Sequence, residues 1–315
     1  MAATTEPTTI TVDVPISYGG TSITTSWISA QFTRAFNPDT LVIMVPGATE
    51  TSDYFEFEYK SETYNSALYL RRRGYSTLTV DRLGTGKSGK PLSRKITTVA
   101  QSTALHTLIQ EVRDGKLGWT PTNIVVLGHS IGSMIAIVTQ SIYRDIDALV
   151  LTGYAHAPAS EPIIAALYST FIPAPDSTEL HDDGYDPGYL THAPLPPEPT
   201  ATPPDVTQYA RSIMSVVSGN EADAVHLTVE SRLTDLIDIP VFLGVGGNDA
   251  IFCSALSPGN DCTNADTLAE TEAPRFPNAP VFTSYVLPGA DHTVQLDANA
   301  PMLNAAICAW LDTNI

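Results

Sequence analysis

The sequence predicts an α/β fold, with a mostly parallel sheet, helices on both faces and an inserted, mainly helical cap. Short apolar strand segments alternate with segments of helical periodicity, which is typical of a parallel sheet covered on both faces. Two segments rich in β-branched residues precede this alternation, and one long stretch interrupts it. Together these observations indicate an antiparallel beginning, a parallel core and one insertion.

The overall composition limits the possible partners. The chain has 315 residues, of which 43% are hydrophobic, and a formal net charge of −18. A protein this negative repels nucleic-acid phosphates and anionic lipid headgroups, so we expect no nucleic-acid and no membrane partner. No apolar run is long enough for a transmembrane helix, and the first residues lack the basic and apolar regions of a signal peptide.

The first expected element is a β-hairpin, which an alternating core follows. Residues 9–16 and 22–32 alternate in polarity and predict the hairpin, with Gly19-Gly20 near its turn. Further strands are expected at 40–46, 76–81, 123–128, 147–152, 240–245 and 280–287. Helical periodicity predicts helices at 62–73, 98–114, 131–143 and 296–312.

The stretch that follows residue 152 is too long for a simple crossover between strands. Its helical segments are expected at 160–170, 206–217 and 221–236. The proline-rich stretch at 193–205 is also compatible with a linker between two domains, which the chain length allows. Because only two strands follow, we favour one core, formed by residues 1–154 and 239–315, with a cap at 155–238.

The most informative motif lies where an apolar strand runs directly into a helix. Gly128-His129-Ser130-Ile131-Gly132 matches G-x-S-x-G, in which a sharp turn exposes a serine oxygen. Glycines on either side let neighbouring backbones approach closely, and the helix N-terminus stabilises a developing oxyanion. An ordinary glycine-rich turn is the alternative, but strand, turn and helix follow in the order that the motif requires. Ser130 is therefore the predicted nucleophile.

A nucleophilic serine needs a histidine base and an orienting carboxylate, which should follow later strands in the order acid, then histidine. Asp249 follows the strand at 240–245, and His292 follows the strand at 280–287. Sheets of this class place their sites at the carboxyl ends of such strands. We predict Asp249 as the orienting acid and His292 as the general base. Asp291 is the rival carboxylate, but its side chain should point away from that of its neighbour.

The oxyanion of such a reaction needs two N–H donors. One is expected from Ile131, directly after the nucleophile, and the other from the loop after an early strand. That loop reads Val45-Pro46-Gly47-Ala48-Thr49. Ala48 is therefore the candidate for the second donor, and Thr49 is the alternative.

These motifs together resemble the α/β-hydrolase superfamily, in the branch whose cap follows the sixth strand. The segment 81–88 (DRLGTGKS) is similar to the D-x-x-G-x-G-x-S turn of that family. Pro46 stands where the family usually has a histidine, and the resemblance implies an oxyanion donor at Ala48. The resemblance covers residues 40–155 and 240–312 and leaves the cap without a counterpart. It implies a Ser-His-Asp enzyme that needs no metal or organic cofactor.

Several other residues have competing interpretations. Tyr54, His129 and Tyr154 are predicted substrate contacts, and packing against the sheet is the alternative. The segment GTGKS is similar to a phosphate loop, but Asp81 stands where that motif requires glycine and would repel phosphate. The acidic segment at 181–186 lacks the spacing of a calcium loop, so we expect a solvated turn and no metal site.

The three cysteines are too few for a disulfide framework. Cys253 and Cys262 are close enough to pair within a loop, whereas Cys308 lies on an apolar helical segment. A disulfide between the first two would indicate an oxidising, extracellular setting, and two reduced thiols would indicate the cytoplasm. The sequence leaves both open.

The expected function is that of a serine hydrolase acting through an acyl-enzyme on an ester, lactone or thioester. The cap favours a small to medium, partly apolar substrate, and the negative charge favours a neutral one. An acyltransferase, a C–C hydrolase or a lyase with the same triad are the alternatives. A non-catalytic ligand-binding protein of the same fold is disfavoured because no triad member is missing.

Overall fold

The computed structural model describes residues 5–17, 23–36, 39–156, 169–193, 201–253 and 260–315. Eight strands form its main sheet: β1 (Thr8–Ser17), β2 (Ile23–Thr33), β3 (Thr40–Val45), β4 (Ser76–Asp81), β5 (Asn123–His129), β6 (Ala148–Thr152), β10 (Val241–Gly246) and β11 (Phe282–Leu287). All lie within a few residues of their predicted positions. Gly19-Gly20, expected near the hairpin turn, lie outside the described residues.

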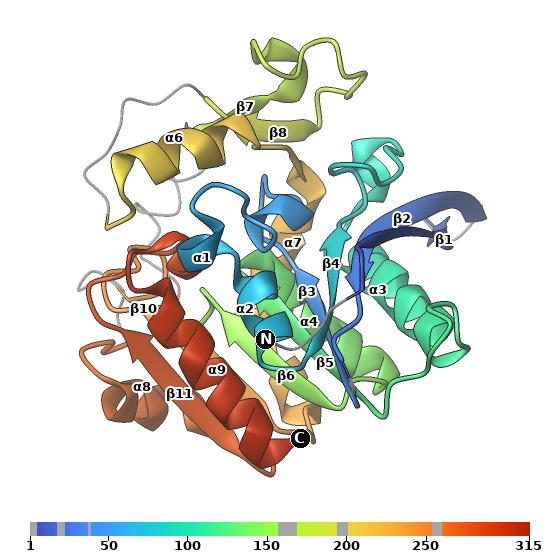
Figure 1. Cartoon of the computed structure of the whole chain (residues 1–315). Helices are drawn as coiled ribbons and strands as arrows, with labels where there is room; N and C mark the ends of the chain where they lie inside the picture. Colours follow the sequence, from blue (N-terminus) through green and yellow to red (C-terminus); the bar gives the residue numbers. More distant parts are fainter. Residues whose placement is uncertain (1–4, 18–22, 37–38, 157–168, 194–200, 254–259) are drawn as a thin grey trace.

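The strands are arranged in the order β1-β2-β4-β3-β5-β6-β10-β11 (Figure 1). Strand β2 pairs antiparallel with β1 and with β4, and the other neighbouring strands pair in parallel. The antiparallel beginning and the mostly parallel core are therefore confirmed.

Helices cover both faces of this sheet, as predicted. The main helices are α1 (Ser61–Tyr64), α2 (Ser66–Arg72), α3 (Thr98–Arg113), α4 (Ile131–Tyr143), α8 (Ala265–Glu272) and α9 (Ala300–Asn314). The helix expected at 62–73 is divided at Asn65, whose side chain accepts a hydrogen bond from the Leu68 N–H and begins α2. Helix α8 was not predicted, because its polar sequence carries little apolar periodicity.

Each face of the sheet has its own apolar core. In β3, the side chains of Leu41, Ile43 and Val45 pack in the core that contains α3 and α4. Val42 and Met44 alternate with them and pack in the core that contains α2 and α9. This alternation of buried residues explains why the central strands are apolar throughout and why the sheet must be covered twice.

The insertion between β6 and β10 contains more than helices. Its described elements are β7 (Phe171–Pro173), β8 (Tyr189–His192), α6 (Pro204–Ser212), β9 (Val217–Ser218), α7 (Asp223–Val225) and several single turns. The strands β7, β8 and β9 form a small antiparallel sheet, which the sequence did not predict. Strands of two to four residues are too short to produce a clear period. The helix expected at 206–217 ends at Ser212, and most of the one expected at 160–170 lies outside the described residues.

Buried polar contacts tie the insertion to the core. The Arg82 guanidinium, directly after β4, pairs with the Glu221 carboxylate, and both side chains are 1% exposed. Asp223 accepts hydrogen bonds from the backbone N–H and the hydroxyl of Thr98 at the start of α3. In Figure 1, β7, β8 and α6 lie at the top of the view, above the loops that follow the parallel strands. The insertion thus lies over the edge of the sheet where the site was predicted.

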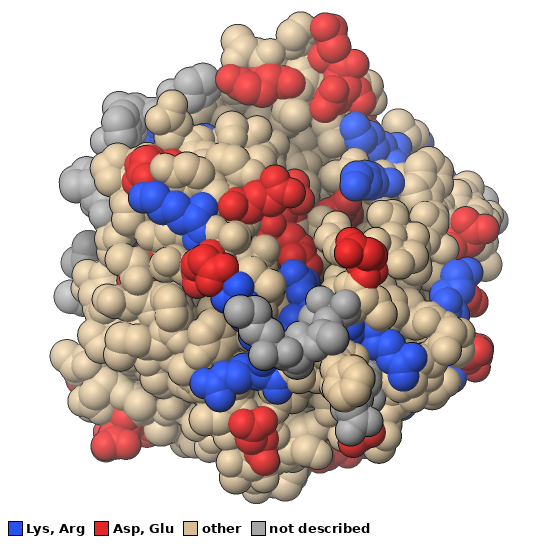
Figure 2. Space-filling view, in the orientation of Figure 1, with Lys and Arg blue, Asp and Glu red and all other residues tan. Residues whose placement is uncertain are grey.

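The surface in the orientation of Figure 2 carries both signs of charge. Lysine and arginine side chains alternate there with aspartate and glutamate, and large uncharged areas lie between them (Figure 2). This face is therefore not uniformly acidic, although the chain has a net charge of −18. Within the described part of the chain, none of the helices has the length and apolarity needed to cross a membrane.

Candidate active site

Ser130 lies at the sharp turn between β5 and α4, with a backbone φ of 52° and ψ of −120°. This conformation is strained for any residue with a side chain and is typical of an exposed nucleophile. A Cβ atom on Gly128 would lie 2.4 Å from the Ser133 backbone nitrogen, and one on Gly132 would lie 2.1 Å from the Val45 carbonyl oxygen. Close packing therefore explains both glycines of the motif.

The three predicted triad residues form one continuous chain of hydrogen bonds. The Ser130 Oγ lies 2.9 Å from His292 Nε2, and His292 Nδ1 lies 2.9 Å from Asp249 Oδ2. Asp249 follows β10, His292 follows β11, and Ser130 follows β5. The carboxyl ends of three parallel strands thus bring together side chains that are far apart in the sequence.

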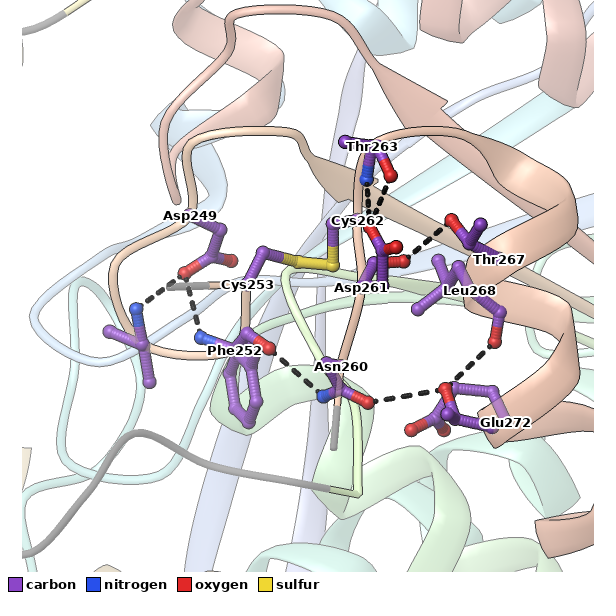
Figure 3. Close-up of a disulfide and its surroundings, with 12 residues drawn as sticks. Asp249, Phe252, Cys253, Asn260, Asp261, Cys262, Thr263, Thr267, Leu268 and Glu272 are labelled. Atoms are coloured by element: carbon purple, nitrogen blue, oxygen red, sulfur yellow. Dashed lines mark hydrogen bonds between the residues drawn. A yellow bond between two sulfur atoms is a disulfide. The ribbon is translucent and has the colours of Figure 1, made fainter. Parts of the chain in front are cut away.

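The Asp249 carboxylate is fully buried and held by its own loop. Its Oδ1 accepts hydrogen bonds from the backbone N–H groups of Ile251 and Phe252, at 2.9 and 3.2 Å. A disulfide between Cys253 and Cys262 follows directly (Figure 3). The backbone donors leave Oδ2 available for the histidine, and the Cys253 N–H donates to the Asp249 carbonyl oxygen at 2.7 Å, so the disulfide begins at a residue that contacts the acid.

Asp291, the rival acid, contacts a different part of the molecule. Its carboxylate accepts a hydrogen bond from the backbone N–H of Ala201 in the insertion. Asp249 is therefore the hydrogen-bond partner of His292, and Asp291 lies beside the site as a contact to the insertion.

His292 has a raised pKa. Burial lowers it, but the negative charge of Asp249, the hydrogen bond to that carboxylate and the charge of Glu50 together raise it above the usual value. With the Nδ1 proton donated to Asp249, the neutral ring presents Nε2 as an acceptor for the Ser130 hydroxyl. The arrangement is suited to removing a proton from the serine.

Glu50 is part of the site and was missed by the sequence analysis. Its Oε2 accepts a hydrogen bond of 2.6 Å from the Gly47 N–H, and its Oε1 lies 4.0 Å from His129 Nε2. Burial raises the pKa of Glu50 to about 8, against the opposing effects of the Gly47 N–H and of the positive charges of His292 and Arg82. In the sequence, Glu50 is only an acidic residue three positions after a glycine, and no motif identifies it as part of a site.

The backbone of the early loop is fixed by neighbours on both sides. The Arg82 guanidinium donates to the Gly47 carbonyl oxygen at 3.0 Å, and the Ser215 N–H of the insertion donates to the Thr49 carbonyl oxygen at 2.7 Å. Ala48 and Ile131, the predicted oxyanion donors, both line a cavity that contains Ser130. Both residues therefore lie beside the serine, whereas the Thr49 carbonyl contacts the insertion.

The three predicted substrate contacts differ in their positions. Tyr54 stacks on His129 with ring centroids 4.7 Å apart, and both side chains line the larger cavity beside Ser130. Burial, and then the positive charge of His292, lower the pKa of His129 well below its usual value, so this ring is neutral. Tyr154 lines neither of the two described cavities: its ring is fully buried, and its hydroxyl donates to the Thr228 carbonyl oxygen. That side chain has a packing role instead.

Carboxylates next to the phosphate-loop-like segment and in the acidic segment at 181–186 hold loops together through hydrogen bonds. The Asp81 carboxylate accepts hydrogen bonds from the backbone N–H groups of Ser52 and Lys87, so it holds two loops together. Asp186 accepts from the Ser93 N–H at 2.8 Å. Among the residues that the structure describes, no group of three or more histidine, cysteine, aspartate or glutamate side chains is arranged to hold a metal ion.

Two cavities meet at Ser130. The larger has a volume of about 400 Å³ and also contains His292, whereas the smaller has a volume of about 130 Å³ and also contains Ile131. Ala48 and Phe171 line both. A small molecule bound across them would lie against the serine oxygen.

Comparisons with known proteins agree with this architecture. The family model described as "Alpha/beta hydrolase family" matches residues 42–305. No curated protein has a matching sequence. Among solved structures, the chain is similar to an esterase from Thermogutta terrifontis, with a TM-score of 0.61 and 18% identity over 96% of this chain and 98% of that one.

Two further solved structures show how widely this fold is used. A carboxylesterase from the thaumarchaeon Nitrososphaera gargenis has a TM-score of 0.63 and 14% identity over 95% of this chain and 98% of that one. A bromoperoxidase from Bacillus anthracis has a TM-score of 0.57 and 15% identity over 96% of this chain and 100% of that one. At identities this low, the structural likeness shows the fold alone, and the reaction has to be argued from the residues of the site. The family match spans most of the sequence, and the chain belongs to the alpha/beta hydrolase family.

Proposed function

We propose that the protein is a serine ester hydrolase with Ser130 as nucleophile, His292 as general base and acid, and Asp249 as orienting acid. The observation that carries this proposal is the pair of 2.9 Å hydrogen bonds that connect the three side chains. Serine is a weak nucleophile on its own, and such a chain is the means by which proteins activate it. The esterases among the similar structures support the same reaction class.

In the first half of the reaction, His292 Nε2 takes the hydroxyl proton as Ser130 Oγ forms a bond to the ester carbonyl carbon. The negative charge that develops on the carbonyl oxygen is stabilised by the N–H groups of Ala48 and Ile131. The tetrahedral intermediate then breaks its bond to the alcohol oxygen, which receives the proton from His292. An alcohol leaves, and the acyl group remains on the serine.

In the second half, a water molecule takes the place of the alcohol. His292 removes one of its protons, the hydroxide oxygen bonds to the acyl carbon, and the same N–H groups hold the second oxyanion. The bond to Ser130 Oγ breaks and the serine regains its proton. The products are one alcohol and one carboxylic acid for each ester consumed.

The proposed substrates are neutral esters, with lactones and thioesters as chemically equivalent carbonyl compounds. Support comes from the cavity beside Ser130, whose lining contains apolar side chains such as Tyr54 and Leu296. An ester of moderate size fits a volume of about 400 Å³, which lies within the usual range for small-molecule sites.

Labelling with a fluorophosphonate probe tests the proposal. We expect one adduct, on the peptide that contains Ser130, and no adduct in Ser130→Ala. Ser133→Ala is the matched control, because the Ser133 hydroxyl is buried in the same turn but hydrogen-bonds to the Thr152 backbone instead of to His292. A folded wild-type protein that takes up no label and releases no acid from p-nitrophenyl butyrate would overturn the proposal.

A further inference from the structure

The two cavities differ in which parts of the triad they contain. Ser130 lies on the border of both, but His292 lines only the larger cavity. Ile131, one of the two proposed oxyanion donors, lines only the smaller. A substrate bound at Ser130 therefore meets two chemically different environments, one on each side of its carbonyl carbon.

The direction of proton transfer decides which half of an ester enters which cavity. Given the proposed function, on which this inference rests, the leaving oxygen must face His292 Nε2 to receive its proton, and the carbonyl oxygen must face the N–H groups of Ala48 and Ile131. The remaining substituent of the carbonyl carbon then points away from His292. We propose that the smaller cavity is the acyl pocket and that the larger one holds the alcohol half of the ester.

The lining of the smaller cavity indicates an uncharged acyl group. Its side chains are mostly apolar and include Met134, Phe171, Leu190, Val217, Val225 and Phe252. Glu221 also lines it, but the carboxylate is paired with Arg82 and accepts the Ser218 N–H. Among the described residues that line this cavity, a carboxylate on the acyl group would meet no cationic side chain, and it would lose its hydration.

The volume of the smaller cavity limits the length of the acyl chain. At about 130 Å³ it is slightly smaller than the roughly 150 Å³ apolar cavity known to hold one benzene ring. An acyl group of about four to six carbons fills such a space, and a longer chain extends beyond its apolar lining. The preferred acids are therefore butanoate to hexanoate in size.

The larger cavity suits a bulkier and more polar alcohol. Its volume is about three times as great, and its lining includes the titratable side chains of Glu50, His192, Arg211 and Asp291. Hydroxyl, amide or ring substituents on the alcohol would find polar contacts there. The combined site is thus asymmetric, with a short apolar acid on one side and a large, partly polar alcohol on the other.

Two ester series separate the pockets. In p-nitrophenyl esters from acetyl to decanoyl, we expect kcat/KM to rise up to butanoyl or hexanoyl and to gain nothing from longer chains, because further methylenes reach beyond the apolar lining. In butanoyl esters of alcohols from methanol to large ring-bearing alcohols, we expect kcat/KM to change less than about threefold or to rise. A preference for long acyl chains together with small alcohols would overturn the assignment.

Matched variants on the two cavities give a second test. Ala222 lines only the smaller cavity and Ala210 only the larger. Ala222→Leu should move the acyl optimum to acetyl, with about a tenfold loss for hexanoyl esters, and leave the order of the alcohol series unchanged. Ala210→Leu should change the alcohol series and leave the acyl optimum in place. The reverse pattern would contradict the proposal.

A variant that enlarges the smaller cavity provides a test if the Ala222→Leu protein does not fold. Met134→Ala should extend the optimum toward longer acyl chains, and an unchanged acyl profile in this variant would contradict the assignment. Fluorophosphonate labelling of Ser130 in each variant distinguishes failure of the proposed function from failure of the pocket assignment. Absence of labelling in the wild-type protein defeats the proposed function, whereas full labelling with the opposite chain-length pattern defeats only the assignment of the pockets.

Discussion

The floor and the roof of the site are held in different ways. The floor consists of the loops after β5, β10 and β11, where Ser130, His292 and Asp249 are connected by short hydrogen bonds and Asp249 is fully buried. The roof is the insertion, which packs apolar side chains such as Tyr189 and Val217 in the core that contains α3 and α4, and which pairs Glu221 with Arg82. The difference suggests that the floor determines the chemistry, and that the roof determines which molecules reach it.

The largest expected effect concerns the floor. Asp249→Asn should lower kcat for ester hydrolysis by about 10⁴-fold, because the histidine then holds the wrong tautomer. Steady-state hydrolysis of p-nitrophenyl butyrate measures this. Asp291→Asn is the matched control, since its carboxylate contacts Ala201 instead of His292, and a decrease of less than about tenfold is expected. Equal losses in both variants would contradict the assignment of the acid.

The next effect concerns the attachment of the roof. Arg82→Ala should lower the free energy of unfolding by about 3–5 kcal/mol, because it leaves the buried Glu221 carboxylate without its partner. Lys60→Ala removes a solvent-exposed pair with Asp205 of the same insertion and should change the free energy of unfolding far less. Urea unfolding of both variants measures the contrast. Similar losses of stability in the two variants would mean that the Arg82–Glu221 pair is not the main polar contact between the insertion and the core.

A pH effect on stability is expected from Glu50. Its pKa is about 8 in the folded protein and near 4.5 when exposed, so the folded state binds more protons between these values. Stability should therefore fall as pH rises from 4.5 to 8, by a few kcal/mol at most. Glu50→Gln keeps an oxygen for the Gly47 N–H and should remove this contribution. Urea unfolding at pH 5 and pH 8 tests it, and identical pH dependence in both proteins would refute it.

The smallest expected effect is on the pH dependence of activity. His292 must be neutral to accept the serine proton, and its pKa is raised by Asp249 and Glu50. The acidic limb of kcat/KM should therefore have its inflection above 6.5, the usual histidine value. Glu50 is mostly protonated near this pH, because its own pKa is about 8, so Glu50→Gln should leave the inflection almost unchanged. An inflection at or below 6.5 in the wild-type protein would show that the raised pKa does not govern activity.

The sequence analysis predicted the floor well because its constraints are local. Gly128 and Gly132 are required by close approach around Ser130, and Asp249 and His292 directly follow apolar strands, so each leaves a pattern in a few residues. Glu50 was missed because its role comes from burial and from a contact with Gly47, neither of which has a sequence signature. For Tyr154, only the folded chain shows that its ring is fully buried and is not among the residues that line the two described cavities.

The small sheet of the roof was not predicted, for a different physical reason. Strands β7, β8 and β9 are too short to show alternation, and it is their pairing with one another that makes them a sheet. The Cys253–Cys262 pairing was left open by the sequence, because spacing alone permits a disulfide without requiring it. The structure shows the disulfide, which begins four residues after Asp249 at a residue whose N–H donates to the Asp249 carbonyl oxygen.

The most direct measurement is mass spectrometry of the enzyme quenched during turnover of p-nitrophenyl butyrate. The sample is wild-type protein quenched within the first turnovers, because Asp249→Asn would slow both the formation and the loss of the acyl group. The account predicts a butanoyl group on the peptide that contains Ser130, formed with the release of one equivalent of p-nitrophenol and lost as butanoate appears. Turnover without an adduct, or with an adduct on another peptide, would contradict the acyl-enzyme at Ser130.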